Sequence, residues 1–95
     1  MSQSADQTIE VQVTITNKLG MHARPAMALV DIANSFKSDI SIKKEKQKVD
    51  AKSIMQVMLL AATAGTDLVI EAIGPDAEKA ATAIKDLVDR KFDEE

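Results

Sequence analysis

The single histidine of the chain, His22, lies within the segment NKLGMHARPA (residues 17–26), two residues before Arg24 and three before Pro25. A neutral imidazole is a nucleophile, and a guanidinium presents a fork of donors that suits phosphate oxygens. If a helix begins here, the positive end of its dipole lies next to the imidazole ring. The backbone N–H groups of Ala23 and Arg24, unpaired at the helix start, can then bind an anion. These residues at this spacing point to a histidine that accepts a phosphoryl group and holds it in place.

The same residues also allow a simpler interpretation. A lone histidine near a helix start is often only a cap or a surface residue, and a lone arginine is more often a solvated charge than a ligand. Pro25 suits the first turn of a helix for structural reasons alone, because its missing N–H costs nothing there. On the physical chemistry of these residues alone, both interpretations stand.

Other site chemistries lack the residues that they need. The chain has no cysteine and one histidine, which excludes a disulfide framework and a cysteine nucleophile and disfavours a structural zinc site. It also has no HExxH motif and no phosphate-binding loop of the GxxxxGK type. We therefore expect no cofactor and no metal, and a phosphoryl carrier rather than a free-standing enzyme.

The composition narrows the class of protein and its partners. The 95 residues are 45% hydrophobic and 28% charged, which is typical of one globular domain covering the whole chain. A net charge of −3 and only two aromatic residues, Phe36 and Phe92, argue against nucleic-acid partners. The start of the chain does not resemble a signal peptide, and no apolar run is long enough to span a membrane. The sequence thus predicts a soluble cytoplasmic protein.

Hydrophobic periodicity predicts the elements in the first half of the chain. Residues 1–8 are polar and predict a frayed tail, after which IEVQVTI (residues 9–15) alternates as a strand does. A helical pattern starts at or just after His22. Its apolar stripe consists of Ala26, Met27, Leu29, Val30, Ala33 and Phe36.

Residues 39–51 predict two short strands with Ile40, Ile42 and Val49 facing inward. Their connection, KKEKQK, lacks an Asn-Gly or Asp-Gly pair. We therefore expect a turn that is longer than a tight hairpin or differently shaped.

The second half of the chain adds a short helix, a strand and a long helix. Ser53 is a good N-cap for an apolar helix from about residue 54 to 60, DLVIEAIG (residues 67–74) predicts a strand, and Asp76 is placed to cap a final helix. The apolar stripe of that helix consists of Ala77, Ala80, Ala81, Ile84, Leu87 and Val88. The order βαββαβα predicts an α+β fold with an antiparallel sheet covered on one side by helices.

Two motifs resemble those of a known family. LGMHARPA (residues 19–26) is similar to the active-site signature of HPr, the histidine-containing phosphocarrier family of the phosphoenolpyruvate-dependent sugar phosphotransferase system. AKSIMQVM (residues 51–58) is similar to the second signature of that family, around its regulatory serine. The similarity runs from about Ile9 to Val88. It implies an open-faced β-sandwich of four antiparallel strands and three helices.

The resemblance also implies roles for particular residues. His22 would be phosphorylated on Nδ1 by phospho-enzyme I and would pass the phosphoryl group to an enzyme IIA domain. Arg24 and the backbone N–H groups of Ala23 and Arg24 would stabilise the phosphate. Ser53 would be a regulatory site, because an HPr kinase modifies the matching serine in many bacteria.

The short helix carries more apolar residues than one buried face can hold. One explanation is that neighbouring loops bury the whole segment. We favour an exposed partner surface beside His22, because methionine side chains adapt to several partners and the family docks its partners there. The expected surface consists of Met21, Met27, Ile54, Met55 and Met58.

Two other functions remain compatible with the sequence. A regulatory paralogue, such as the nitrogen-related carrier NPr or a carrier used only for signalling, would share the phosphohistidine chemistry and differ in partners. A non-catalytic α+β binding module would contain His22 incidentally. For a carrier that docks transiently, we expect a monomer.

Overall fold

Four strands form one antiparallel sheet in the spatial order β1-β4-β2-β3 in a computed structural model that describes residues 7–94. The expected α+β fold and the order βαββαβα are confirmed, with one extra turn, η1, after the last helix. The elements are β1 (Gln7–Thr14), α1 (Ala23–Asn34), β2 (Asp39–Lys44), β3 (Gln47–Asp50), α2 (Ile54–Leu59), β4 (Asp67–Gly74), α3 (Ala77–Asp89) and η1 (Lys91–Asp93).

The predicted frayed tail is too long by two residues. Gln7 and Thr8 belong to β1, where they pair with Gly74 and Ile73 of β4. Polar side chains do not prevent strand formation at this position, because the ladder to β4 satisfies their backbone groups. The remainder of the predicted tail, residues 1–6, lies outside the described residues.

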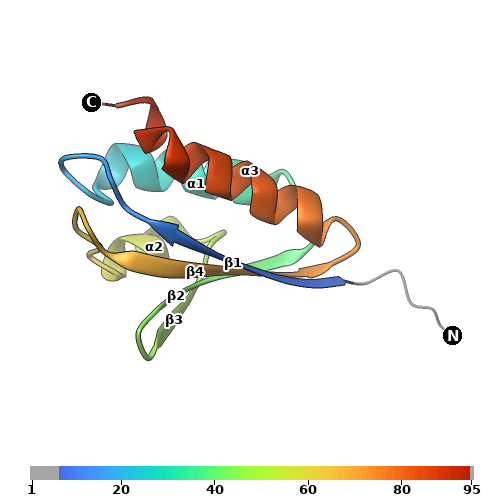
Figure 1. The fold of residues 1–95 in the computed structure, drawn as a ribbon. Coiled ribbons are helices and arrows are strands. Elements are labelled where there is room, and N and C mark those ends of the chain that lie inside the picture. The colour runs from blue at the N-terminus through green and yellow to red at the C-terminus, as the bar shows by residue number, and fades with distance from the viewer. Residues whose placement is uncertain (1–6, 95) are drawn as a thin grey trace, which may run out of the picture.

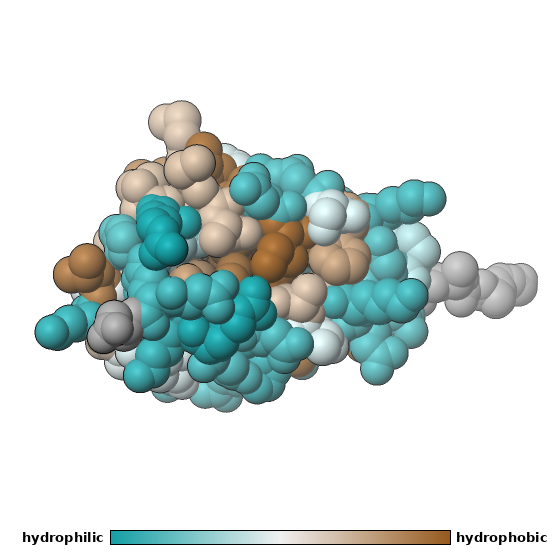
Figure 2. Space-filling model, turned by 90° about the horizontal axis from the view of Figure 1, so that it is seen from above, coloured by the Kyte–Doolittle hydropathy of each residue, from teal (hydrophilic) through white to brown (hydrophobic). Residues whose placement is uncertain are grey.

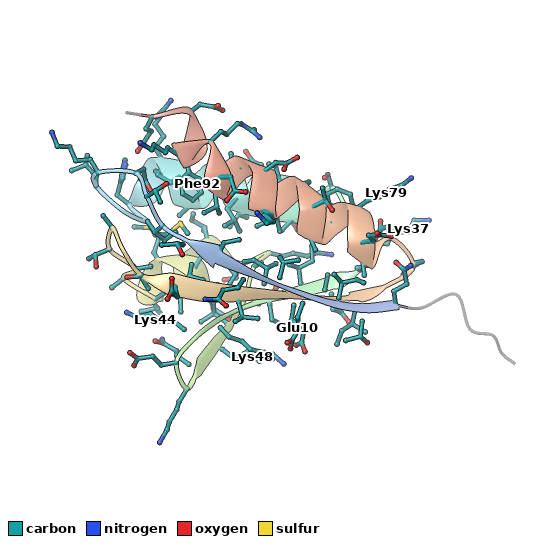
Figure 3. All side chains as sticks on the ribbon, viewed as in Figure 1. Glu10, Lys37, Lys44, Lys48, Lys79 and Phe92 are labelled. Atoms are coloured by element: carbon teal, nitrogen blue, oxygen red, sulfur yellow. The ribbon has the colours of Figure 1, made fainter. Side chains whose placement is uncertain are left out.

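Helices α1 and α3 lie side by side over one face of the sheet, and α2 packs against α1 and β3 at one end (Figure 1). The opposite face is open to solvent and carries charged side chains, Glu10 and Lys48 among them (Figure 3). There, the Nζ of Lys43 lies 3.0 Å from a carboxylate oxygen of Glu10, and the Nζ of Lys48 lies 3.1 Å from one of Glu71. This arrangement is an open-faced sandwich, which confirms the fold that the family resemblance implied.

The core forms where the apolar faces of the strands and helices meet. Every residue of the stripe predicted for α3 is buried, and so are Ile40, Ile42 and Val49 on the hairpin. In α1 the prediction holds apart from Met27, which is 57% exposed, and Phe36, which is half-buried after the helix ends. Burying one such aliphatic side chain contributes roughly 1.5–3 kcal/mol, so this shared core fixes the relative positions of α1 and α3.

The turn between β2 and β3 is a two-residue hairpin, so the expectation of a longer turn is wrong. Lys44 pairs with Gln47, which leaves only Glu45 and Lys46 between the strands. Glu45 takes the left-handed conformation, with φ of 54°. The buried pair Ile42–Val49 explains this result, because a one-residue slip in register would turn its side chains to solvent.

Two predicted helix caps have different outcomes. The cap of α2 is confirmed, since the Ser53 hydroxyl accepts a hydrogen bond from the Gln56 N–H at 3.3 Å. The cap of α3 is wrong in mechanism: Asp76 occupies the N-cap position, but its side chain makes no capping bond to the helix. Its carboxylate instead accepts hydrogen bonds from Ser38 Oγ and from the N–H groups of Lys37 and Ser38. Asp76 thus joins the start of α3 to the loop before β2.

Candidate functional site

His22 is the N-cap residue of α1. Its backbone is extended, with φ of −86° and ψ of −173°, and its carbonyl accepts the first helical hydrogen bond from the Ala26 N–H at 3.0 Å. The predicted helix start is therefore confirmed. No side chain caps this end of the helix within residues 7–94. The N–H groups of Ala23 and Arg24 precede the first helical bond, so they can bind an anion beside the imidazole.

The loop before α1 sets the position of the histidine. Gly20 has φ of +71°, and a Cβ added there would lie 2.6 Å from the carbonyl oxygen of Ala62. The next residue, Met21, donates its N–H to that same carbonyl at 2.8 Å. Glycine is needed at position 20 because both the left-handed backbone and this close approach exclude a side chain. The contact fixes the loop against the segment between α2 and β4, immediately before His22.

A carboxylate from the end of the chain completes the site. The Glu94 side chain, 13% exposed, lies with Oε2 at 3.0 Å from His22 Nε2 and 2.9 Å from Arg24 Nη1. Its Oε1 accepts a hydrogen bond from the Nδ2 of Asn17, which is itself fully buried, at 3.1 Å. Neither Glu94 nor Asn17 was predicted from the sequence. His22 and Arg24 were predicted to lie in one site, and in the structure both contact the same carboxylate.

The segment after α3 carries Glu94 to the site. Lys91, Phe92 and Asp93 have φ values of 58°, 54° and 59°, so the chain turns through three consecutive left-handed residues. Such backbone is unfavourable for residues with a Cβ. Phe92 is 4% exposed and packs in the core at the C-terminal end of α3 (Figure 3), where its burial offsets part of that cost. In the sequence, the one feature that could have indicated this contact is an aromatic residue, Phe92, followed by acidic residues.

The environment of Glu94 favours its ionised form. Partial burial opposes ionisation, but hydrogen bonds from Asn17, His22 and Arg24 outweigh it and lower the pKa of the Glu94 carboxyl below its ordinary value. At neutral pH the site therefore holds a carboxylate between a histidine and an arginine. A shallow hollow beside it is lined by Lys18, Leu19, Arg24 and Glu94.

Four of the five residues predicted to form a partner surface are at least partly exposed. Met55 is 76% exposed, Met58 43% and Met27 57%, and Ile54 is half-buried. Met21 is the exception, because it is 5% exposed and belongs to the hydrophobic core. Hydrophobic side chains gather on one part of the helix-covered side, and the rest of that side is largely hydrophilic (Figure 2). Leu19 and Leu59, both strongly exposed, are apolar surface residues that sequence analysis did not assign to the partner surface.

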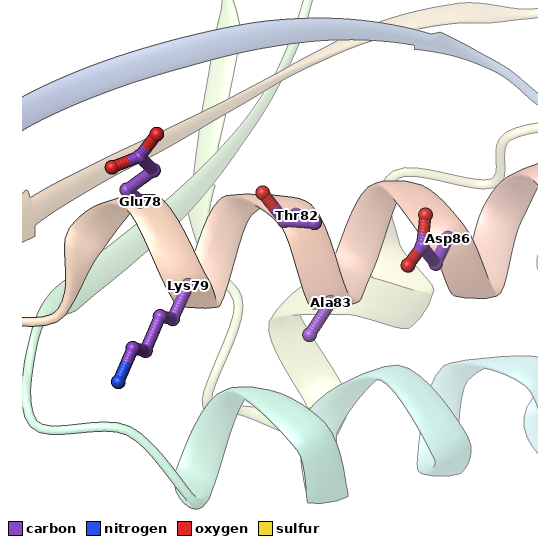
Figure 4. A pocket seen from close by; sticks show the side chains of 5 residues that line it. All are labelled: Glu78, Lys79, Thr82, Ala83 and Asp86. Atoms are coloured by element: carbon purple, nitrogen blue, oxygen red, sulfur yellow. The ribbon is translucent and has the colours of Figure 1, made fainter.

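A second hollow lacks the combination of imidazole, guanidinium and carboxylate found at His22. It is a shallow depression along α3 lined by Glu78, Lys79, Thr82, Ala83 and Asp86 (Figure 4). Its ionic side chains belong to a solvated helix face, and it contains no imidazole. Residues 7–94 also include no group of three or more acidic or histidine side chains arranged to hold a metal ion, and no helix long and apolar enough to cross a membrane.

The fold and site together define a small open-faced α+β sandwich domain with its one histidine at the N-terminus of the first helix. A family model described as "PTS HPr component phosphorylation site" matches residues 9–90. The chain therefore belongs to the HPr family, the phosphocarriers of the phosphotransferase system.

Individual relatives agree with this assignment. The chain is 41% identical over 86 residues to the phosphocarrier protein HPr of Cupriavidus necator, covering 90% of this chain and 97% of that protein. It is 36% identical over 89 residues to the phosphocarrier protein NPr of Escherichia coli K12, covering 93% and 99%. The crystal structure of HPr-C-His from Thermoanaerobacter tengcongensis superposes with a TM-score of 0.89 at 45% identity, covering 92% of this chain and 98% of that one.

Proposed function

We propose that this protein accepts a phosphoryl group on Nδ1 of His22 from phospho-enzyme I and passes it to a histidine of an enzyme IIA domain. The observation that supports the proposal is the position of His22 at the N-cap of α1, next to Arg24. Among residues 7–94 no side chain caps this helix, and the N–H groups of Ala23 and Arg24 precede its first helical hydrogen bond. In this proposal the protein works in the cytoplasm, has enzyme I and an enzyme IIA domain as its partners, and acts as a monomer.

Transfer between two imidazoles requires alignment and charge stabilisation more than a general base. The lone pair of Nδ1 attacks phosphorus, and the P–N bond of the donor phosphohistidine breaks, returning its electron pair to the donor ring. The N–H groups of Ala23 and Arg24 and the guanidinium of Arg24 stabilise the oxygens of the transferring group. Arg24 is suited to this task because it is 68% exposed and only one of its five N–H donors is engaged by Glu94.

The partner surface in this proposal is the exposed apolar patch formed by Met27, Met55 and Met58, with Ile54 at its edge. Ser53 lies at the start of the helix that carries most of this patch. A phosphate on Ser53 would add negative charge there, so we propose that it regulates docking rather than folding. HPr kinase is the enzyme class that would place it.

A regulatory paralogue is the second candidate function. Relatives named HPr and relatives named NPr cover nearly the whole chain at similar identity. Both use the same site, so the distinction lies in the choice of IIA partner. Phosphoryl transfer to purified sugar-specific and nitrogen-regulatory IIA domains, measured side by side, separates the two.

The acceptor assignment is tested by incubating the protein with phosphoenolpyruvate and enzyme I and locating the phosphate by mass spectrometry at neutral pH. We expect acid-labile phosphate on His22 and none in His22→Ala, whose circular dichroism spectrum stays native. Asp31→Asn, an exposed change on the same helix, is the matched control and accepts phosphate normally. Label in His22→Ala, or none in the natural protein, contradicts the proposal and favours a non-catalytic binding module.

A further inference from the structure

We propose that Met27, Met55 and Met58 form a site of reversible oxidation, at which conversion of their thioethers to sulfoxides stops the docking of enzyme I. The modifying substrate is a two-electron oxygen donor of the peroxide class. This inference rests on the proposed function, because it concerns the surface on which the carrier would meet its partner. It adds a form of regulation that needs neither His22 nor Ser53.

The first observation is where the sulfur atoms lie. The chain contains five methionines and no cysteine, so every sulfur atom in it is a thioether. Met1 lies outside the described residues, and Met21 is 5% exposed in the core. The other three are 57%, 76% and 43% exposed, and all of them belong to the apolar patch. Because the chain holds no thiolate that would react first, an oxidant that reaches accessible sulfur in residues 7–94 modifies this patch.

The second observation is how much of the patch depends on these side chains. Within the described part of the chain six large hydrophobic side chains are exposed, and half of them are these methionines. Met55 and Met58 are three residues apart on α2, which places them on the same side of that helix, and α2 packs against α1, which carries Met27. Hydrophobic side chains gather on this helix-covered side (Figure 2). A change in the polarity of three side chains therefore changes the character of the whole surface.

The chemical step needs no group from the protein. A lone pair of the sulfur attacks one oxygen of hydrogen peroxide, and the S–O bond forms as the O–O bond breaks. The proton of the transferred hydroxyl passes to the departing hydroxide, which leaves as water. Sulfur loses two electrons and the peroxide gains them. Methionine sulfoxide reductases return the thioether with two electrons from a thiol reductant, so the modification is reversible.

The consequence is confined to docking. A sulfoxide is polar, and burying it against an apolar partner surface leaves its oxygen without the hydrogen bonds that water supplied. The groups proposed to handle the phosphoryl group, His22, Arg24 and the N–H of Ala23, contain no sulfur. The three methionines are also absent from the hydrophobic core. Oxidation should therefore raise the KM for enzyme I while kcat and the fold stay as they were.

The test compares three full-length proteins: the natural chain, the triple variant Met27→Leu, Met55→Leu and Met58→Leu, and the control Met21→Leu. Leucine keeps an apolar side chain of similar volume and has no sulfur to oxidise. The control removes one sulfur atom from the core and leaves the patch intact. Each protein is treated with hydrogen peroxide, the peroxide is removed before enzyme I is added, and the treated sample is compared with the untreated sample of the same protein.

Mass spectrometry locates the added oxygen, and phosphoryl acceptance gives KM and kcat. In the natural chain and in Met21→Leu we expect sulfoxide first at the three exposed methionines, a KM raised about tenfold, and unchanged kcat and circular dichroism. Treatment with methionine sulfoxide reductases restores the KM. In the triple variant peroxide leaves the KM at its own untreated value.

An unchanged KM in the natural chain with all three sulfoxides overturns the inference, and so does an equal rise in the triple variant. Oxidation of Met21 as fast as the exposed methionines, or loss of the native circular dichroism spectrum, assigns the effect to unfolding and overturns it as well. If the untreated natural chain accepts no phosphate, the proposed function fails before peroxide is added, and this inference fails with it. Normal acceptance both before and after oxidation overturns the inference alone.

Discussion

Ser38 and Asp76 hold each other by reciprocal hydrogen bonds: Ser38 Oγ donates to Asp76 Oδ1 at 2.6 Å, and the Asp76 N–H donates to Ser38 Oγ at 3.2 Å. The residues are 38 positions apart, one in the loop before β2 and the other immediately before α3. This contact ties the start of α3 to the loop that joins α1 to β2. Removing this contact should therefore lower the free energy of unfolding.

Asp76 should make folding stability depend on pH in the acidic range. The hydroxyl of Ser38, and then the N–H groups of Lys37 and Ser38, lower the pKa of Asp76 from 3.8 to about 2. A carboxyl whose pKa is depressed by folding contributes stability above its unfolded pKa and loses it as pH falls through its folded pKa. Asp76→Asn should therefore lower Tm at neutral pH, and the difference from the natural protein should shrink between roughly pH 4 and pH 2. Thermal denaturation across this range checks it, and a difference that is constant with pH would contradict it.

Gly20→Ala should destabilise the protein much more than Gly65→Ala. Both glycines have positive φ, at 71° and 93°, so both variants bear the cost of a left-handed alanine, about 1 kcal/mol. A Cβ at position 65 meets open space, whereas at position 20 it meets the Ala62 carbonyl at 2.6 Å. Backbone atoms must then move, and we expect a total loss of about 2–4 kcal/mol. Urea denaturation of the two variants measures the difference, and equal losses would contradict it.

Ser53→Ala should remove the cap of α2. The lost hydrogen bond to the Gln56 N–H predicts a loss of about 1 kcal/mol of unfolding free energy. Ser53→Asp supplies another capping oxygen and a negative charge at the helix start, so it should keep most of that stability. If Ser53 also regulates docking, Ser53→Asp should weaken enzyme I binding, whereas Ser53→Ala should not. Calorimetry of unfolding and binding separates the two effects.

Met21 and Met55 should respond oppositely to truncation. Met21 is 5% exposed and in the core, so Met21→Ala should cost about 2–5 kcal/mol. Met55 is 76% exposed, so Met55→Ala should change stability by less than about 0.5 kcal/mol. If the patch is the partner surface, Met55→Ala should instead raise the KM for enzyme I. An unchanged KM for Met55→Ala together with Met58→Ala would remove these residues from the docking surface.

Local patterns in the sequence determined most of the fold and the centre of the site. Alternation predicted the strands, the 3.6-residue period predicted α1 and α3, and Pro25 located the start of α1 at His22. Ser53 was also predictable as a cap, because a capping bond reaches only three residues along the chain. In each case the cause acts within a few residues, so the sequence displays it directly.

Only the tertiary structure decided which distant residues meet. Asp76 bonds to Ser38 rather than capping its own helix, the buried Ile42–Val49 pair closes a hairpin without turn residues, and Met21 is buried. Glu94 lies against His22 although 72 positions separate them. No local period encodes such a contact, because it depends on where packing places the end of α3 relative to the start of α1. The sequence therefore determined the histidine, and the fold selected the carboxylate that faces it.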